Sequence, residues 1–140
     1  MESGSYSMFD HTADVGVDVT ASSPEALFET AAVALFDLLV DTRALAPRVE
    51  RFITVTGVDY EELLVRWLAE LLYLHDTEGL LFSRFTVTEL SAGWLTGTAT
   101  GELYDPERHH VKTEIKAVTY HQVSVRPENG GWKARIIFDV

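Results

Sequence analysis

The pattern of hydrophobic and polar residues changes its period along the chain, and each period predicts a type of element. Residues 15–21 alternate between apolar and polar types, which is the period of two expected of a half-buried strand. Ser22, Ser23, Pro24 and Glu25 follow, and they supply N-cap candidates, the first-turn proline of a helix and a Ser22/Glu25 capping-box pair. The apolar positions beyond them cover one broad face, so we predict a helix that ends near residues 39–40.

A second strand and a second helix follow in the same way. Residues 49–56 are rich in β-branched types and stop at Gly57, which predicts a strand. Asp59 and Glu62 have the spacing of a capping box, and Gly79 suits the C-terminal end of the helix that they begin. The leucines of this segment recur at helical spacing, which indicates a face buried in the core rather than a membrane segment or a partner helix.

The rest of the chain is predicted to form strands. Asn129 and Gly130 are a strong hairpin-turn signal between the last two of them. The predicted strands cover residues 80–90, 94–103, 115–120, 122–126 and 132–139. Together, these segments predict an α+β fold class: a single domain over residues 1–140, with two helices packed on one face of a largely antiparallel or mixed β-sheet.

Length and composition limit what kind of protein this is. A chain of 140 residues is long enough for one hydrophobic core. Cysteine is absent, which excludes disulfides, a thiolate nucleophile and Cys-ligated zinc, and which suits a reducing compartment. Residues 1–8 lack the basic start and apolar stretch of a signal peptide, and no apolar run approaches the roughly 20 residues that span a membrane. We therefore expect a soluble, cytoplasmic protein that does not bind membranes.

Net charge argues against unaided nucleic-acid binding. The chain has 22 Asp and Glu against 11 Lys and Arg, and its formal net charge is −11 at pH 7. Proteins that bind nucleic acid by themselves pair basic side chains with phosphates, so we expect no direct nucleic-acid binding. Acidic residues can serve metal binding, docking on a basic protein or solubility alone, and solubility accounts for most of the charge.

Three polar clusters stand out, at residues 10–14, 114–121 and 138–140. With Val140 as the last residue, Asp139 carries its carboxylate next to the free main-chain carboxylate. If the last strand lies beside the first, these oxygens and those of Asp14 converge, and such hard donors suit Ca²⁺ or Mg²⁺. The alternative is structural: Asp14 caps a turn, and Asp139 lies at a frayed strand end. Spacing alone leaves both open.

The remaining candidates are weaker. Residues 104–110, YDPERHH, are predicted to form a loop that contains side chains able to bind a metal ion. His109 and His110 are adjacent, however, and adjacent strand residues point to opposite faces, so the two are poorly placed to share one metal ion. The nucleophile-elbow, P-loop, dinucleotide-binding and zinc-protease motifs are absent from the sequence. Catalysis by the chain alone therefore has little support, and we name no catalytic residue.

The three clusters, in this order and at these distances, resemble the archease family. The matching pieces are DHTADVG at residues 10–16, EIKAVTYH at residues 114–121 and GWKARIIFDV at residues 131–140. The resemblance covers essentially the whole chain. The last residue is Val140 where we expect isoleucine to be common in the family, a change that keeps the main-chain carboxylate.

This resemblance implies an accessory protein rather than an enzyme. Archeases assist the GTP-dependent RNA ligase of tRNA splicing and RNA repair, which joins a 2′,3′-cyclic phosphate or 3′-phosphate end to a 5′-hydroxyl end. They promote guanylylation of the ligase's active-site histidine and so sustain multiple turnover. The implied partner is therefore this ligase, which is free to supply the RNA contacts.

The resemblance also implies roles for individual residues. It implies a divalent-metal site at Asp14, Asp139 and the C-terminal Val140, for Ca²⁺ or Mg²⁺ with Mn²⁺ as an alternative. Lys116 is the residue to which it assigns ligase activation. The residues expected to shape the loop and support the ligands are Asp10, His11, Thr12 and His121.

Two other functions stay open as alternatives. One is a small metal-dependent phosphoester hydrolase, in which Asp14, Asp139 and either His11 or His121 hold a metal that activates water. The other is a chaperone-like interaction module, which predicts an exposed apolar patch. The joint presence of all three clusters favours the ligase activator.

Overall fold

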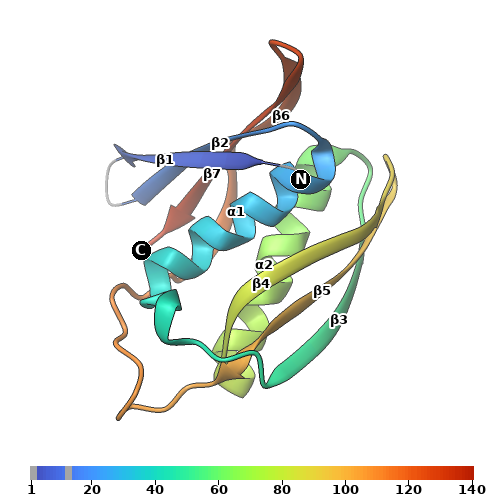
Figure 1. The fold of residues 1–140 in the computed structure, drawn as a ribbon. Coiled ribbons are helices and arrows are strands. Elements are labelled where there is room, and N and C mark those ends of the chain that lie inside the picture. The colour runs from blue at the N-terminus through green and yellow to red at the C-terminus, as the bar shows by residue number, and fades with distance from the viewer. Residues whose placement is uncertain (1–2, 12–13) are drawn as a thin grey trace.

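The computed structural model describes residues 3–11 and 14–140, in which the chain runs through strands and two α-helices as Figure 1 shows. In chain order the elements are β1 (Gly4–His11), β2 (Asp14–Ala21), α1 (Pro24–Leu39), the short 3-10 helix η1 (Thr42–Ala44), β3 (Val49–Thr56), α2 (Tyr60–Glu78), β4 (Leu80–Leu90), β5 (Trp94–Leu103), β6 (Ala117–Glu128) and β7 (Gly131–Asp139). Both predicted helices and most of the predicted strands are therefore confirmed.

The strands form two antiparallel sheets, and the two helices pack against both. One sheet has the order β1-β2-β7-β6, and the other has the order β3-β5-β4. α1 contacts β2 of the first sheet and β4 of the second, while α2 contacts β6 and β3. Figure 1 shows the helices crossing the space between the sheets. The α+β fold class is confirmed, with the strands divided between two sheets because α1 is apolar on more than one face.

The helix ends follow capping signals in the sequence. Of the two N-cap candidates, Ser22 and Ser23, it is Ser23 that caps α1, by accepting a hydrogen bond from a first-turn backbone N–H at 3.1 Å. Asp59 caps α2 by accepting from the Glu62 N–H at 2.8 Å, and Gly79 ends that helix in the left-handed conformation at φ 70°. Within residues 3–11 and 14–140, neither helix combines the length and the apolar composition needed to cross a membrane.

Buried side chains from both helices and both sheets form one hydrophobic core. Trp67 of α2 is fully buried, and its indole N–H donates to the Phe28 carbonyl of α1 at 3.0 Å. Phe36 of α1 packs against Phe82 and Phe85 of β4, with ring centroids 5.5 and 5.7 Å apart. These contacts tie α1 to α2 and to the three-stranded sheet.

Two strands differ from the sequence prediction. β1 begins at Gly4, where the sequence has no clear strand pattern, because an edge strand with one neighbour keeps many of its residues exposed. β6 is one strand where we predicted two, because the break is a bulge rather than a turn. Its pairing with β7 shifts between Thr119 and Ser124, and Gln122 within this bulge has a φ of 56°.

Candidate functional site

The first residue of β2 and the last residue of β7 lie opposite each other. The two strands are antiparallel neighbours, and their register pairs Asp14 with Asp139. Directly paired residues have Cα atoms about 4.5–5.5 Å apart, and their side chains point to the same face of the sheet. From the sequence we expected the Asp14 and Asp139 oxygens to converge only if the last predicted strand lies beside the strand at residues 15–21. The pairing of β2 with β7 meets that condition.

The segment that enters β6 reaches the same place. Ala117, the first residue of β6, is also a register partner of Asp139, and the Lys116 N–H donates to the Asp139 carbonyl at 2.7 Å. The Lys116 side chain is exposed. The start of β2 thus meets the two ends of the β6–β7 hairpin, which are far from it in sequence, at one end of the sheet.

His121 and the residues before Asp14 are placed differently. His121 is exposed on β6 within the bulge, beyond the residues that pair with the end of β7. This position separates it along the strand from Asp139, which pairs with the first residue of β6. Thr12 and the side chains of Asp10 and His11 lie outside the described residues.

The paired carboxylates suit a hard divalent cation better than zinc. Asp14 and Asp139 offer oxygen donors on neighbouring strands, and Ca²⁺ and Mg²⁺ prefer oxygen. Val140 follows Asp139 and packs half-buried against the core. Among the side chains that the structure describes, which exclude those of Asp10 and His11, no three of His, Asp or Glu come together to hold a metal ion. The two aspartates therefore need further ligands to complete a site, and the Val140 main-chain carboxylate, a side chain outside the described ones and water are all oxygen donors of the right kind.

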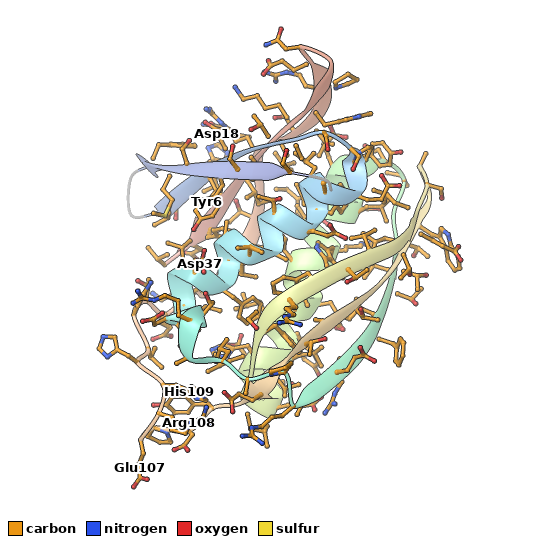
Figure 2. The ribbon with its side chains drawn as sticks, in the orientation of Figure 1. Tyr6, Asp18, Asp37, Glu107, Arg108 and His109 are labelled. Carbon is orange, nitrogen blue, oxygen red and sulfur yellow. The ribbon has the colours of Figure 1, made fainter. Side chains whose placement is uncertain are left out.

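A second polar cluster joins the end of β5 to the loop that follows, and Figure 2 labels Arg108 and His109 on that loop. Glu102 and His109 are buried, with 3% and 5% of their surface exposed. The Glu102 carboxylate accepts hydrogen bonds from Arg108 at 2.7 Å and from the Ala46 N–H at 2.8 Å. His109 Nε2 lies 3.1 Å from the same carboxylate. The Asp105 N–H donates to His109 Nδ1 at 2.8 Å, which places the ring proton on Nε2, toward Glu102.

These contacts keep Glu102 ionised. The hydrogen bonds from Arg108 are the largest cause that lowers the pKa of Glu102 from 4.5 to about 2, followed by the bond from the Ala46 N–H, while burial acts in the opposite direction. The sequence pointed to the YDPERHH loop but not to Glu102, which occupies an ordinary position in a predicted strand.

The loop held by Glu102 leads to Lys116. On its way it is tied to the end of α1, where Val111 forms a β-bridge with Val40 and the Lys112 N–H donates to the Leu39 carbonyl at 2.9 Å. The loop is therefore attached at two places, to Glu102 through Arg108 and His109 and to the end of α1 through Val111 and Lys112. These contacts position the segment that places Lys116 near the paired aspartates.

The outer face of the four-stranded sheet is polar and holds a well-formed ion pair. Arg135 of β7 donates from Nε and Nη2 to the two Asp18 oxygens at 2.8 and 3.0 Å, and this contact lowers the pKa of Asp18. On the other face, the Tyr6 hydroxyl donates to Asp37 of α1 at 2.6 Å. Figure 2 shows Asp18 on the side of the sheet away from α1 and Tyr6 on the side toward it. Since Asp14 is in step with Asp18 along β2, it belongs to the outer face as well.

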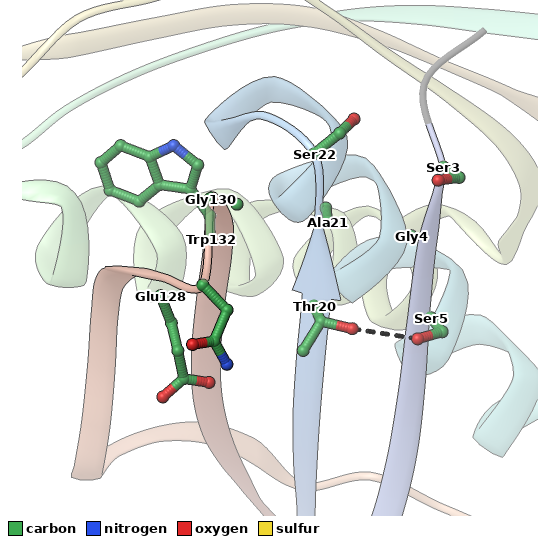
Figure 3. A pocket seen from close by; sticks show the side chains of 11 residues that line it. Ser3, Gly4, Ser5, Thr20, Ala21, Ser22, Glu128, Gly130 and Trp132 are labelled. Atoms are coloured by element: carbon green, nitrogen blue, oxygen red, sulfur yellow. Dashed lines mark hydrogen bonds between the residues drawn. The ribbon is translucent and has the colours of Figure 1, made fainter.

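A hollow of about 510 Å³ lies at the opposite end of this sheet. Hydroxyl side chains and glycines make up most of its lining, and the Ser5 and Thr20 hydroxyls hydrogen-bond across it at 3.0 Å (Figure 3). β2 begins at Asp14 and ends at Ala21, so the hollow lies a full strand length from the paired aspartates. It therefore does not belong to the candidate metal site.

Comparison with known proteins gives one consistent result. Residues 6–140 match the Archease protein family. Protein archease of Methanopyrus kandleri is 47% identical over 134 residues, covering 94% of this chain and 96% of that protein. Protein archease of Pyrococcus furiosus is 45% identical over 136 residues, with coverage of 94% and 96%. The solution structure of Methanobacterium thermoautotrophicum protein 1598 matches with a TM-score of 0.84 at 43% identity, covering 96% of this chain and 98% of that chain. With its fold and nearly its whole length matched in this way, the chain belongs to the archease family.

Proposed function

We propose that this protein is an accessory factor of the GTP-dependent RNA ligase of tRNA splicing and RNA repair. In this proposal it promotes guanylylation of the ligase's active-site histidine, sustains multiple turnover, and acts in the cytoplasm as a partner of the ligase rather than as an enzyme. Membership of the archease family supports the proposal, because the resemblance of the three motifs to that family implies this role.

The observation that carries the proposal is the meeting of Asp14, Asp139 and Lys116. The register pairs the two aspartates, and the Lys116 N–H is bonded to the Asp139 carbonyl. The family resemblance singles out the same three residues from three separate motifs. Since Asp14 is far from the other two residues in sequence, its proximity to them in the fold supports a joint role.

The proposed metal ligands are Asp14, Asp139 and, with Val140 as the last residue, the Val140 main-chain carboxylate. These are oxygen donors for Ca²⁺ or Mg²⁺, with Mn²⁺ as an alternative. A bound cation supplies positive charge that can neutralise phosphate oxygens. The chain itself holds two carboxylates at a fixed spacing on adjacent strands and presents the exposed Lys116 ammonium from the neighbouring segment.

Guanylylation of the cognate ligase, measured with GTP and a divalent metal in the presence and absence of this protein, tests the proposal. We expect the wild-type protein to stimulate guanylylation and Lys116→Ala to lose most of the stimulation while keeping its fold and metal affinity. Lys112→Ala is the matched control, because Lys112 is an exposed lysine of the same loop. Absence of stimulation by the wild type, or turnover of phosphoesters by this protein alone, would overturn the proposal.

Calorimetric metal titration tests the ligand set separately. Asp14→Asn, Asp139→Asn and an extension of the chain beyond Val140 each remove negative charge from the same cation, so each should weaken metal binding. An extension ahead of Met1 is the control and should leave metal affinity unchanged. Wild-type affinity in both aspartate variants would show that the paired carboxylates are not ligands.

A further inference from the structure

The outer face of the four-stranded sheet contains a hollow that the proposed function does not use. Its volume is about 330 Å³, and it lies over β6, β7 and β2. The residues that line it are Asp18, Gln122, Ser124, Arg126, Lys133 and Arg135. It lies on the same face as the paired aspartates, further along the same two strands.

The charge of this hollow is opposite to that of the chain. The chain as a whole has twice as many acidic as basic residues and a net charge of −11. The hollow is lined by three basic side chains and one carboxylate. Solubility does not require a cluster of basic side chains in an acidic protein, so the cluster in this hollow needs another explanation.

Arg126 and Lys133 are arranged at a cost to stability. The register of β6 and β7 makes them direct partners, and like charges directly opposite each other on neighbouring strands destabilise a sheet. Their shared counter-ion is Glu128, which lies 3.4 Å from Arg126 Nη2 and 3.9 Å from Lys133 Nζ. Charge-assisted hydrogen bonds of good geometry are about 2.7–2.9 Å long, so Glu128 compensates these cations weakly.

Arg135, by contrast, is held firmly in place. Two of its nitrogens bind Asp18 at 2.8 and 3.0 Å, and a third lies 3.4 Å from the Gln122 side-chain oxygen. Its guanidinium carbon lies 4.4 Å from the centre of the Phe9 ring. The hollow therefore has one fixed cationic wall and, beside it, two cations whose present partner is easily exchanged.

We propose that this hollow binds the phosphate groups of a free nucleotide. Two opposed cations, a fixed guanidinium and the Ser124 hydroxyl offer more donors than Asp18 and the distant Glu128 accept, whereas phosphate oxygens are numerous and arranged around a tetrahedral centre. An anion placed between Arg126 and Lys133 also removes the repulsion between them. A nucleotide fits better than RNA, because the net charge of −11 on the chain repels an extended polyanion, while a small ligand contacts only the hollow itself.

Calorimetric titration with inorganic pyrophosphate and with GTP tests this proposal on the full chain, without the ligase. The test variant is Arg126→Ala/Lys133→Ala. The matched control is Arg51→Ala/Lys112→Ala, which loses the same two charges elsewhere: Arg51 is a half-exposed β3 arginine paired with Glu78 at 3.0 Å, and Lys112 is an exposed lysine that donates to the Asp37 carbonyl at 3.0 Å. Since both double variants have the same net charge, any difference in their affinity for the two probes reflects binding in the hollow rather than net charge.

We expect wild type and control to bind both probes saturably and the test variant to bind at least about tenfold more weakly, the effect of losing one charge-assisted hydrogen bond. The test variant should also unfold at the same or a higher temperature than the wild type, because it no longer opposes like charges. Failure of the wild type to bind pyrophosphate at millimolar concentration would overturn the proposal, as would equal losses in both variants. Binding of an RNA oligonucleotide that neither pyrophosphate nor GTP displaces would overturn it in favour of an RNA surface.

Discussion

Replacing Glu102 with glutamine should destabilise the fold, because it removes the charge of a buried carboxylate that four neighbouring groups contact. The His109 ring and the Ala46 N–H both bind Oε2 of Glu102, so a glutamine carbonyl oxygen at that position can keep both contacts. The glutamine NH2 then takes the place of Oε1, where it faces the Arg108 Nη1 donor that now lies 2.7 Å from that oxygen. Losing a hydrogen bond between charged groups costs about 1.5–3 kcal/mol, so we expect a loss of about 2 kcal/mol and a fall of about 4–8 °C in Tm.

The same substitution should change how stability depends on pH. The pKa of Glu102 is lowered from 4.5 to about 2, chiefly by Arg108. A carboxyl with a lowered pKa in the folded state stabilises the fold fully above its ordinary pKa, and this contribution is lost as the pH falls through the folded value. Denaturant unfolding of both proteins between pH 6 and pH 2 should therefore show the largest difference in unfolding free energy above about pH 5, shrinking toward pH 2. Glu89→Gln, at an exposed position on β4, is the control. A difference that stays constant across this range would refute the assignment of Glu102 as a charged anchor.

Three further substitutions probe other parts of the fold. Gly101→Ala should cost more than about 3 kcal/mol in denaturant unfolding, because a Cβ there would collide with the Leu81 carbonyl of the adjacent strand; a loss below about 1 kcal/mol would contradict this packing. Tyr6→Phe removes the hydrogen bond to Asp37 and should cost about 1 kcal/mol. Because burial and this contact raise the pKa of Tyr6 to about 12, wild-type stability should decline between pH 10 and pH 12, and the variant should lack the tyrosine's share of that decline. Asp59→Ala should lower the unfolding free energy by about 1 kcal/mol, whereas Asp59→Asn, which can still cap α2, should cost much less.

The sequence predicts the fold well where the signal is local. Capping residues and hydrophobic period define α1 and α2, and the predicted bounds of β3, β4 and β5 agree with the structure. β1 carries no such signal, because its place depends on pairing with β2 rather than on its own composition. The bulge around Gln122 resembles a chain break in the sequence, since a residue with positive φ interrupts an otherwise regular strand.

The candidate site, too, could be predicted from the sequence only in part. The sequence identified Asp14, Asp139 and Lys116 through their motifs, but only the strand order and register bring them together, and neither follows from spacing. Glu102 was missed because its burial depends on donors from two other segments, the Ala46 backbone and the loop that contains His109. Such a cluster has no local pattern, since each residue by itself is ordinary for its position.

The pairing of β2 with β7 also determines when the candidate site can form during synthesis. Asp18 and Arg135, which face each other in this pair, are 117 residues apart in sequence. β3, β4 and β5 come from one contiguous part of the chain, so the three-stranded sheet can assemble around α2 while the ribosome is still working. Until β7 emerges, β2 can pair only with β1. The entropy cost of closing so long a loop must be met before the pairing of β2 with β7 contributes any stabilising free energy. A nascent or truncated chain without β7 therefore leaves β2 as an open sheet edge. Asp14 can pair with Asp139 only after β7 has been synthesised and has joined the sheet.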